Sequence, residues 1–461
     1  MAFAEIIDNS REEMIQKLQT LVRINSVEGA AEEGKPFGSG PAEALAQVLS
    51  IANEMGFKTE NMDNYIGFAE WGEGKEILAI LVHMDVVPVG DGWSMNPFCG
   101  EVIGNRLYGR GSYDDKGGAV AAIYALKAVK DSGAKFHKRV RIIFGTNEET
   151  GMNDIDHYLQ REGQPDMAFS PDSPFPAVFG EKGVLDFDIT YPVGKMTHIR
   201  SFQGGDNRKF TPNACIVTMA VNDEEKAFLL KKLAAFTKFE SSYEETEQGM
   251  LSILIKGKRI FAVCPQDGKN AATGMIDFLS GVDFLADEIG AFCNYYMEKL
   301  GYCYDASTIG CDVNDTISTP LTLSPDIFQL QGDKMIFSVH CRFPVTGICD
   351  EIVAKLSKAL TTNKASVEFV RVSPAHYVSK ESKLVSTLMN VYRRITGDTD
   401  AQPVTMEGGT YARTMNNAVA FGPLFPGEPQ VAHCPDEFVN LDSLIKAAKI
   451  YAHAIYELCC E

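Results

Sequence analysis

The chain has 461 residues, of which 45% are hydrophobic and 23% are charged, so it can bury a sizeable core as globular proteins do. Its formal net charge of −19 argues against nucleic acid and anionic membranes as partners, because an acidic surface repels phosphate groups. The 11 cysteines include no CxxC pair, and the N-terminus has no basic start followed by an apolar run. We therefore expect free thiols, no secretory signal and a cytoplasmic location.

The first part of the chain alternates helical and strand patterns. Ser10 and Glu13 form a capping-box pattern that predicts a helix beginning near residue 10, and Pro41 and Gly56 mark the limits of a second helix. Alternation of this kind indicates an α/β architecture with a largely buried sheet. The further predictions are an apolar strand at 76–87, a helix at 116–133, and strands that begin the segments 139–151 and 167–172.

The pattern changes at about residue 184 and returns to the first type after Pro374. The simplest interpretation is a catalytic domain of residues 1–183 and 378–461, interrupted by an inserted α+β domain of residues 184–377. In the insertion we predict strands, helices at 223–236, 274–300 and 349–360, and loops at 201–213 and 239–248. In the last part we predict a helix at 382–396, a glycine loop at 408–409, a strand at 418–424 and a helix at 443–458.

Polar side chains follow the predicted buried strands, which is where open α/β sheets place their ligands. His83 and Asp85, in HMDVVP, are two residues apart and therefore share one face of a strand. A carboxylate beside a histidine is typical of the support that a metal-binding imidazole receives. A buried His–Asp hydrogen bond without any metal explains the same pair.

Three further pairs or single residues have the side chains of metal ligands. Asp114 and Asp115 precede a helix in GRGSYDDKGG, where acids also act as caps. Glu148 and Glu149, in GTNEETG, follow a strand and repel each other unless a cation lies between them or one is protonated. Asp172 ends the segment MAFSPD.

His433 lies late in the chain, in VAHCPDE. Each of these residues alone is a weak signal, but together they suit two zinc-like ions that activate a water molecule, with a further glutamate as general base. The chain has neither a GxxxxGK[ST] loop nor a GxGxxG unit between strand and helix, which argues against a nucleotide site. The chain also lacks the GxSxG elbow of serine hydrolases.

In this order, HMDVVP, GRGSYDDKGG, GTNEETG, SPD and AHCPDE resemble the motifs of the di-zinc aminopeptidase-like amidohydrolases. That superfamily includes aminoacylases, carnosinases, desuccinylases and dipeptidases. GEKG (180–183), CRFP (341–344) and GGTYAR (408–413) make the chain most similar to the peptidase V type. The resemblance implies a three-layer α/β/α catalytic domain with an inserted α+β lid domain.

The resemblance also implies a ligand set for two zinc ions. Asp114 would bridge the ions, His83 and Asp172 would complete one site, and Glu149 and His433 would complete the other. Carboxylates and imidazoles suit manganese and cobalt as well as zinc.

The same resemblance assigns roles around this ligand set. Glu148 would be the general base, Asp85 would support His83, and a cis peptide bond would follow Asp114. Arg342, in CRFP, would hold the carboxylate of the substrate, for which a guanidinium fork is well shaped. Gly408 and Gly409, the glycines of the GGTYAR motif, would let the backbone approach the substrate. An ordinary turn explains these two glycines as well.

Two positions of the insertion depart from the resemblance. Phe261 stands where the pattern has a histidine that stabilises the oxyanion, and the loss of one such donor typically raises the barrier by ~2.7–4 kcal/mol. Lys209, in GGDNRKFTPNA, stands where the peptidase V type has a substrate-binding asparagine.

The function expected from these features is hydrolysis of the amide bond of dipeptides or short peptides that have a free C-terminal carboxylate. A hydroxide that bridges the two metal ions would attack, with Glu148 as general base. One alternative is an N-acyl amino acid deacylase, and another is a metal-containing, non-catalytic peptide-binding protein whose lid is impaired by Phe261. The expected partner is a small peptide, with no nucleic acid or membrane, and the protein would be a monomer or a homodimer.

Overall fold

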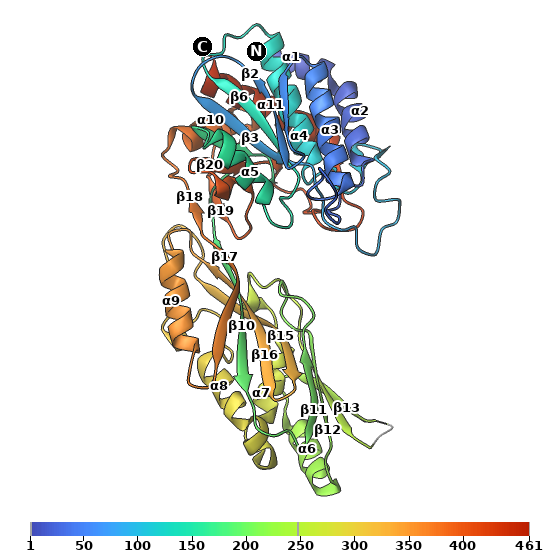
Figure 1. Ribbon diagram of the computed structural model, residues 1–461, viewed down its shortest axis with the longest axis vertical. Coiled ribbons are helices and arrows are strands. Elements are labelled where there is room, and N and C mark those ends of the chain that lie inside the picture. Colours follow the sequence, from blue (N-terminus) through green and yellow to red (C-terminus); the bar gives the residue numbers. More distant parts are fainter. Residues whose placement is uncertain (1, 247–248, 461) are drawn as a thin grey trace. The chain divides into compact units, whose positions relative to one another are not determined.

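The computed structural model describes residues 2–246 and 249–460, which form two compact units (Figure 1). The first unit contains the residues up to 181 and those from 377 onward, and the second contains residues 182–376. The chain therefore leaves the first unit once and returns to it, so the second unit is an insertion.

The first unit is built on a nine-stranded sheet whose centre is parallel. Strands β6, β3, β7 and β20 run parallel to one another. The apolar run that predicts a strand at 76–87 forms β3, which ends at His83 and is almost completely buried. The strands are, in spatial order, β1 (Lys58–Met62), β2 (Ile66–Trp71), β6 (Arg139–Gly145), β3 (Ile77–His83), β7 (Met167–Ser170), β20 (Ala418–Phe421), β9 (Ala177–Glu181) and β18 (His376–Tyr377), with β19 (Val404–Met406) paired to β9.

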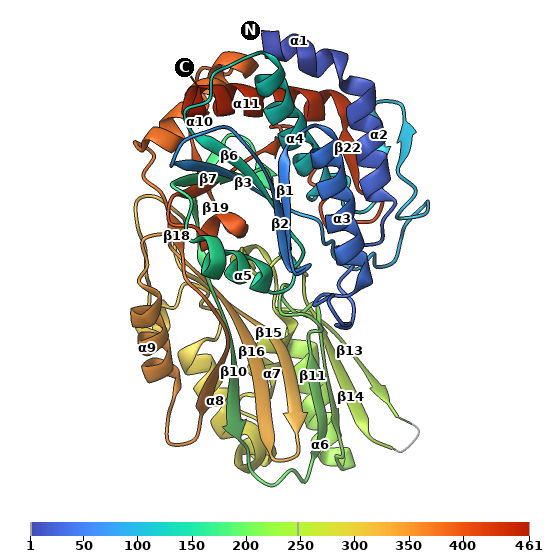
Figure 2. The same cartoon turned by 45° about the horizontal axis from the view of Figure 1, so that its top comes forward.

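Helices cover both faces of this sheet. Helices α4 (Lys116–Asp131) and α11 (Leu441–Cys459) pack together and both contact β3 and β6. On the other face, Ala79 and Leu81 of β3 join a buried cluster with Ile155 of helix α5 (Asn153–Glu162). Figure 2 shows the sheet between α5 and α11. Both faces of β3 are thus buried, which is why its sequence is a continuous apolar run.

The first unit contains further helices and short strands. They are α1 (Ala2–Asn9), α2 (Arg11–Val22), α3 (Ser39–Glu54) and α10 (Lys383–Thr396), the 3₁₀ turn η5 (Tyr411–Thr414), and the strands β4 (Glu101–Ile103), β5 (Arg106–Tyr108), β8 (Ser173–Pro174), β21 (Pro423–Leu424) and β22 (Phe438–Asn440). The predicted capping box is wrong. Ser10 follows helix α1, which the sequence analysis missed, and its hydroxyl donates to the carbonyl of Ile6 at 2.8 Å.

The second unit is an eight-stranded sheet whose neighbouring strands are antiparallel. In spatial order its strands are β13 (Glu240–Glu245), β14 (Leu251–Lys256), β12 (Ala214–Met219), β11 (Ile199–Gly204), β15 (Thr322–Gln331), β16 (Lys334–Phe343), β10 (Gly183–Pro192) and β17 (Ser366–Ser373). Its helices are α6 (Asp223–Ala235), α7 (Ala271–Leu279), α8 (Ala291–Lys299) and α9 (Cys349–Leu360).

Strand β16 shows how the faces of this sheet differ. Phe337, Val339 and Cys341 are fully buried in one core with residues of helices α7, α8 and α9. Because side chains alternate along a strand, the residues between them, such as His340 and Arg342, lie on the opposite face. The second unit therefore has an apolar, helix-covered face and a face that carries polar side chains.

The predicted helix at 274–300 is wrong, because the chain is helical there only in pieces. Helix α7 ends at Leu279, and Gly281 adopts a φ of 70°, which ends the helix before a 3₁₀ turn (Asp283–Leu285), a π turn (Ala286–Gly290) and α8. The predicted loops at 201–213 and 239–248 contain parts of strands β11 and β13, and residues 247–248 lie outside the described residues. Strand β13 is highly charged because it is an edge strand of the sheet.

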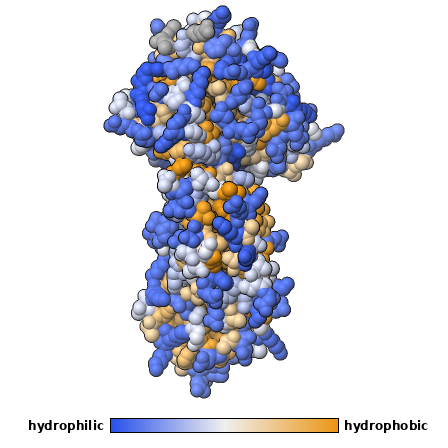
Figure 3. Space-filling view, turned by 90° about the vertical axis from the view of Figure 1, so that its left-hand side faces the viewer, coloured by the Kyte–Doolittle hydropathy of each residue, from blue (hydrophilic) through white to orange (hydrophobic). Residues whose placement is uncertain are grey.

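Polar and charged residues cover most of the face seen in Figure 3. None of the described helices combines the length and the apolar character that crossing a bilayer requires.

Candidate metal centre

The polar residues of the first unit converge at the ends of neighbouring strands. His83 is the last residue of β3, and the segments that follow β6 and β7 contain Glu149 and Asp172. Because β6, β3 and β7 are parallel neighbours, their carboxyl ends meet at one edge of the sheet. Asp114 precedes α4 and His433 precedes β22, and both reach the same edge.

Asp114 lies between two histidines. Its Oδ1 is 3.0 Å from Nε2 of His83, and its Oδ2 is 3.2 Å from Nε2 of His433. Each oxygen of one carboxylate therefore faces a different imidazole. This is the arrangement that a carboxylate needs to bridge two metal ions.

Each of these histidines also faces a further carboxylate. Nε2 of His433 is 3.1 Å from Oε2 of Glu149, and Nε2 of His83 is 3.9 Å from Oδ2 of Asp172. Two ligands of one tetrahedral zinc ion, each at about 2.1 Å, are separated by about 3.4 Å. The observed separations bracket that value, so the residues fit two divalent ions.

The ring nitrogens of His83 support the same interpretation. Its Nδ1 is 2.9 Å from the backbone carbonyl of Asp85, to which an Nδ1–H group donates. In the neutral imidazole the lone pair of Nε2 then points at the carboxylate of Asp114, which is repulsive unless a proton or a metal ion lies between them.

The electrostatics of the cluster show how strongly it attracts cations. Burial, together with repulsion by nearby carboxylates, raises the pKa values of Glu148 and Asp172 well above their usual range. The hydrogen bonds that the His433 imidazole donates to the carboxylates of Asp114 and Glu149 raise the pKa of His433 to about 11. Buried carboxylates at this density are stable when cations compensate their charge. In two sets of three residues, all ligand atoms lie within 4.8 Å of one another: His83, Asp114 and Glu149, and His83, Glu148 and Asp172.

Asp85 has two contacts that hold the cluster together. Its Oδ1 lies 3.5 Å from Nδ1 of His83. The backbone carbonyl oxygen of Asp85 is closer to the same nitrogen, at 2.9 Å. Its carboxylate also accepts hydrogen bonds from the backbone N–H groups of Glu148 and Glu149, at 3.2 and 3.1 Å. Asp85 therefore fixes the loop that carries both glutamates as well as lying beside His83. The peptide bond after Asp114 is cis, as expected from the resemblance.

Glu437 is a functional candidate that the sequence pattern does not single out. Its Oε1 accepts hydrogen bonds from the backbone N–H groups of Gly111, Tyr113 and Asp114, at 3.0–3.2 Å. Its Oε2 accepts from Nη1 of Arg110 at 2.6 Å. Glu437 is completely buried and so fixes the loop that presents Asp114. The only sequence signal was its position in AHCPDE.

A Glu437→Ala variant should lose about 3–5 kcal/mol of unfolding free energy, because it leaves the buried guanidinium of Arg110 without its carboxylate. Urea unfolding measures this loss. The matched control is Asp442→Ala, which removes the exposed partner of Arg11 and should cost below about 1 kcal/mol. Equal losses in the two variants would show that Glu437 does not act as a buried anchor.

Asp154 fixes the second loop of the cluster. It is fully buried at the start of α5, and its Oδ2 accepts from the backbone N–H groups of Thr146 and Asn147 at 2.6 and 2.9 Å, and from the hydroxyl of Tyr411. These contacts hold the backbone just before Glu148. In the sequence Asp154 looks like an ordinary acidic residue in the first turn of a helix.

The structure gives Gly409 a packing role in the first unit. A Cβ on Gly409 would lie 2.2 Å from Cζ of Arg413, whose Nε donates to the buried Glu181 at 2.9 Å. Gly408 lies at the same turn, and its carbonyl accepts from Nη2 of Arg413 at 3.4 Å. These contacts explain why a side chain is absent at Gly409 without requiring a substrate.

Lys209, Phe261 and Arg342 belong to the second unit. The backbone carbonyl of Lys209 accepts from the N–H of Ala262 at 2.9 Å, so the two positions that depart from the resemblance lie side by side. The Phe261 side chain is 57% exposed and packs at 4.6 Å between ring centroids against Phe210. Arg342 lies on the polar face of the sheet and contacts His340.

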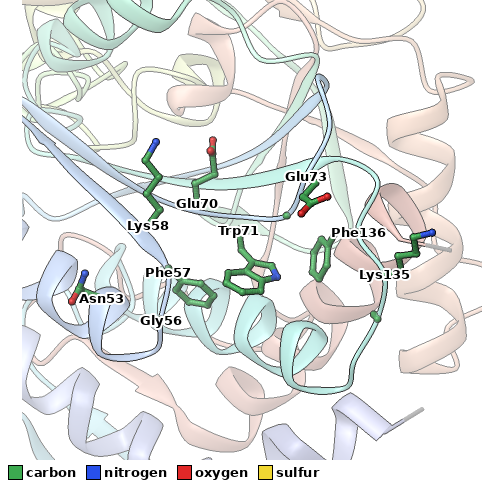
Figure 4. A pocket seen from close by; sticks show the side chains of 11 residues that line it. Asn53, Gly56, Phe57, Lys58, Glu70, Trp71, Glu73, Lys135 and Phe136 are labelled. Carbon is green, nitrogen blue, oxygen red and sulfur yellow. The ribbon is translucent and has the colours of Figure 1, made fainter.

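A surface cavity of about 750 Å³ lies elsewhere in the first unit (Figure 4). Phe57, Trp71 and Phe136 line it together with charged side chains, and none of the residues of the metal cluster is among its lining residues. Glu70, which also lines the cavity, is paired with Arg141 at 2.7 Å. The cavity is therefore separate from the candidate metal centre.

Comparison with known proteins identifies the family of the chain. Residues 79–457 match peptidase family M20/M25/M40. The chain is 36% identical to "Putative dipeptidase YtjP" of Bacillus subtilis (strain 168) over 97% of both chains, and 32% identical to a "Putative dipeptidase" of Staphylococcus epidermidis over 97% of both.

Solved structures show the same fold. Human carnosine dipeptidase 1 superposes with a TM-score of 0.57 at 15% identity, covering 99% of this chain and 98% of that one. The dipeptidase Dug1p of Saccharomyces cerevisiae gives a TM-score of 0.57 at 15% identity, covering 98% and 97%. The predicted fold, an α/β catalytic domain with an inserted lid domain, is confirmed. The chain belongs to peptidase family M20/M25/M40, whose activity is the hydrolysis of peptides.

Proposed function

We propose that this chain is a metal-dependent dipeptidase with two divalent ions, zinc in the first instance, and with manganese or cobalt as substitutes. Asp114 would bridge the ions, His83 and Asp172 would bind one, and Glu149 and His433 would bind the other. The observation that carries the proposal is the carboxylate of Asp114, whose two oxygens lie 3.0 and 3.2 Å from two different imidazoles. When bound, the ions would polarise the scissile carbonyl and lower the pKa of water.

Glu148 is proposed as the general base. Its side chain lies close to His83 and Asp172, and its backbone N–H donates to Asp85. Within the described part of the chain, no histidine hydrogen-bonds to the carboxylate of Glu148, whereas His433 contacts that of Glu149. Glu148 would take a proton from the attacking water as the new C–O bond forms. It would then give that proton to the amine nitrogen as the C–N bond breaks, which is the usual work of a carboxylate with a raised pKa.

Arg342 is proposed to hold the C-terminal carboxylate of the peptide. It lies at the end of β16 on the polar face of the second unit, and its side chain is partly exposed. A guanidinium group binds a carboxylate through two parallel hydrogen bonds. A requirement for a free carboxylate close to the scissile bond favours dipeptides over longer chains.

The testing experiment is a hydrolysis panel with the zinc-loaded full chain. Dipeptides should be cleaved, and the same dipeptides amidated at the C-terminus should be cleaved much more slowly. N-acyl amino acids form the second arm, because the metal cluster by itself recognises only the amide bond. Cleavage of N-acyl amino acids in preference to dipeptides would replace the proposal by the deacylase alternative.

Phe261 is the observation that favours a protein without catalytic activity. A phenyl ring cannot donate a hydrogen bond to an oxyanion, and this ring is 57% exposed rather than part of the core. A zinc-loaded protein that binds dipeptides by calorimetry but hydrolyses neither arm of the panel would establish this second candidate.

A further inference from the structure

The polar face of the second unit carries a connected group of side chains around Arg342. Strands β10 and β16 pair so that Asp186 lies directly opposite His340. Arg342 is two residues beyond His340 on the same strand, so its side chain leaves the sheet on the same face. We call Asp186, His340 and Arg342 the arginine relay.

The hydrogen bonds of the relay have a defined direction. Nε of Arg342 donates to Nε2 of His340 at 2.9 Å, and Nδ1 of His340 is 2.6 Å from Oδ1 of Asp186. Arginine is always a donor, so Nε2 of His340 must be the unprotonated nitrogen. The proton therefore lies on Nδ1 and is donated to Asp186, which makes the imidazole neutral.

Burial and charge make this arrangement rigid. The His340 side chain is only 4% exposed, whereas Arg342 lies at the accessible end of the group. Burial, with the positive charges of Arg342 and Arg371, lowers the pKa of His340 despite the hydrogen bond to Asp186. Burial opposes the charge of Asp186, but the hydrogen bond from His340 holds the pKa of that carboxyl below its usual value.

Nε of Arg342 contacts the imidazole of His340, and that imidazole lies between Arg342 and the carboxylate of Asp186. The imidazole fixes the orientation of Arg342 by accepting a hydrogen bond from its Nε. The negative charge of Asp186 lies on the other side of the imidazole ring from the guanidinium group. An arginine that is already oriented loses less side-chain entropy when it binds an anion.

We propose that Asp186 and His340 are positioning residues that hold Arg342 in the orientation in which it binds the C-terminal carboxylate of a peptide substrate. The inference rests on the proposed function and adds to it the determinant of carboxylate specificity. Neither residue is proposed to touch the substrate or the metal ions.

The first test is a His340→Leu variant of the zinc-loaded full chain. Loss of a hydrogen bond to a charged group should raise KM for a dipeptide about tenfold, with kcat changed by less than about twofold. KM for the same dipeptide amidated at its C-terminus should not change. A His340→Gln variant can accept from Arg342 and donate to Asp186, and it should restore KM to within about threefold of the wild type.

A double-mutant cycle with Arg342→Ala separates positioning from structural support. If His340 acts through Arg342, adding His340→Leu to Arg342→Ala should leave KM unchanged. The matched control is His198→Leu, which breaks a different His–carboxylate pair of the second unit, with Glu288 at 2.7 Å, and should leave KM as in the wild type. Should His340→Leu fail to fold, Asp186→Ala replaces it, with the same expected rise in KM.

Three results would overturn the relay: an equal rise in KM for the amidated dipeptide, an additive loss in the Arg342→Ala background, or no change in KM in a folded His340→Leu protein. Failure of the proposed function is recognised separately, because the wild-type protein would then hydrolyse no dipeptide. In that case calorimetry measures Kd for a dipeptide and for its C-terminal amide, in the wild type and in His340→Leu. The relay predicts that His340→Leu weakens binding of the dipeptide and leaves binding of the amide unchanged.

Discussion

A Glu148→Gln variant should retain its metal ions and lose turnover. The amide has almost the shape of the carboxylate but cannot take a proton from water, and loss of a general base typically slows a reaction by about 10²–10⁴-fold. Glu148 is partly buried beside the other carboxylates of the cluster and lies on a loop fixed by Asp85, so the substitution should not move its neighbours. The measurements are kcat for a dipeptide and the metal content of the purified variant.

The metal content decides between two roles for Glu148. Its carboxylate lies near enough to His83 and Asp172 for all three to bind one ion. A variant with two ions and no turnover supports the general base, whereas a variant that has lost one ion identifies Glu148 as a ligand. The matched control is Glu60→Gln on the exposed side of β1, which should behave as the wild type. Wild-type kcat in Glu148→Gln would contradict the mechanism.

An Asp114→Asn variant should lose at least one of the two ions and most of its activity. An amide offers a single weak oxygen ligand, so it cannot bridge two ions as the carboxylate facing both His83 and His433 does. We expect kcat/KM to fall at least about 100-fold, because removing a residue that only supports a ligand already costs about 10–100-fold and Asp114 is itself proposed as a ligand. Elemental analysis and calorimetric titration with zinc measure the stoichiometry.

The control for Asp114→Asn is the same change at the exposed Asp223, in the first turn of α6. It should leave metal content and activity unchanged. An Asp114→Asn protein that still binds two zinc ions per chain would show that Asp114 is not the bridging ligand. Treatment with a chelator followed by addition of zinc, manganese or cobalt compares the metals in the wild type.

The elements that could be predicted from sequence are those with a strong local signal. The amphipathic run at 349–360 forms α9 with those limits, and the apolar run before His83 forms the central strand β3. The segment 274–300 was harder because its apolar residues continue through Gly281, where the backbone turns out of the helix. Strand β13 was missed because an exposed edge strand has no apolar alternation.

Sequence alone supplied the candidate residues, since motifs such as HMDVVP and GTNEETG place acids and histidines where strands end. Contacts across long stretches of chain were not accessible in this way. Glu437 holds the backbone of Asp114 from more than 300 positions later, and Asp154 reaches Thr146 across a turn. Neither residue carries a pattern that separates it from an ordinary surface acid, because only the fold shows which backbone donors it meets.

The order of the motifs therefore determined the family, the α/β class and the kinds of side chain available for metal binding and proton transfer, since these depend on residue type and on local spacing. Tertiary structure decided which atoms meet: the two imidazoles on the oxygens of Asp114, the anchoring of two loops by Glu437 and Asp154, and the link from Asp186 through His340 to Arg342. Hydrogen bonds and metal ligation require separations near 3 Å, and only the packing of distant segments sets distances on that scale.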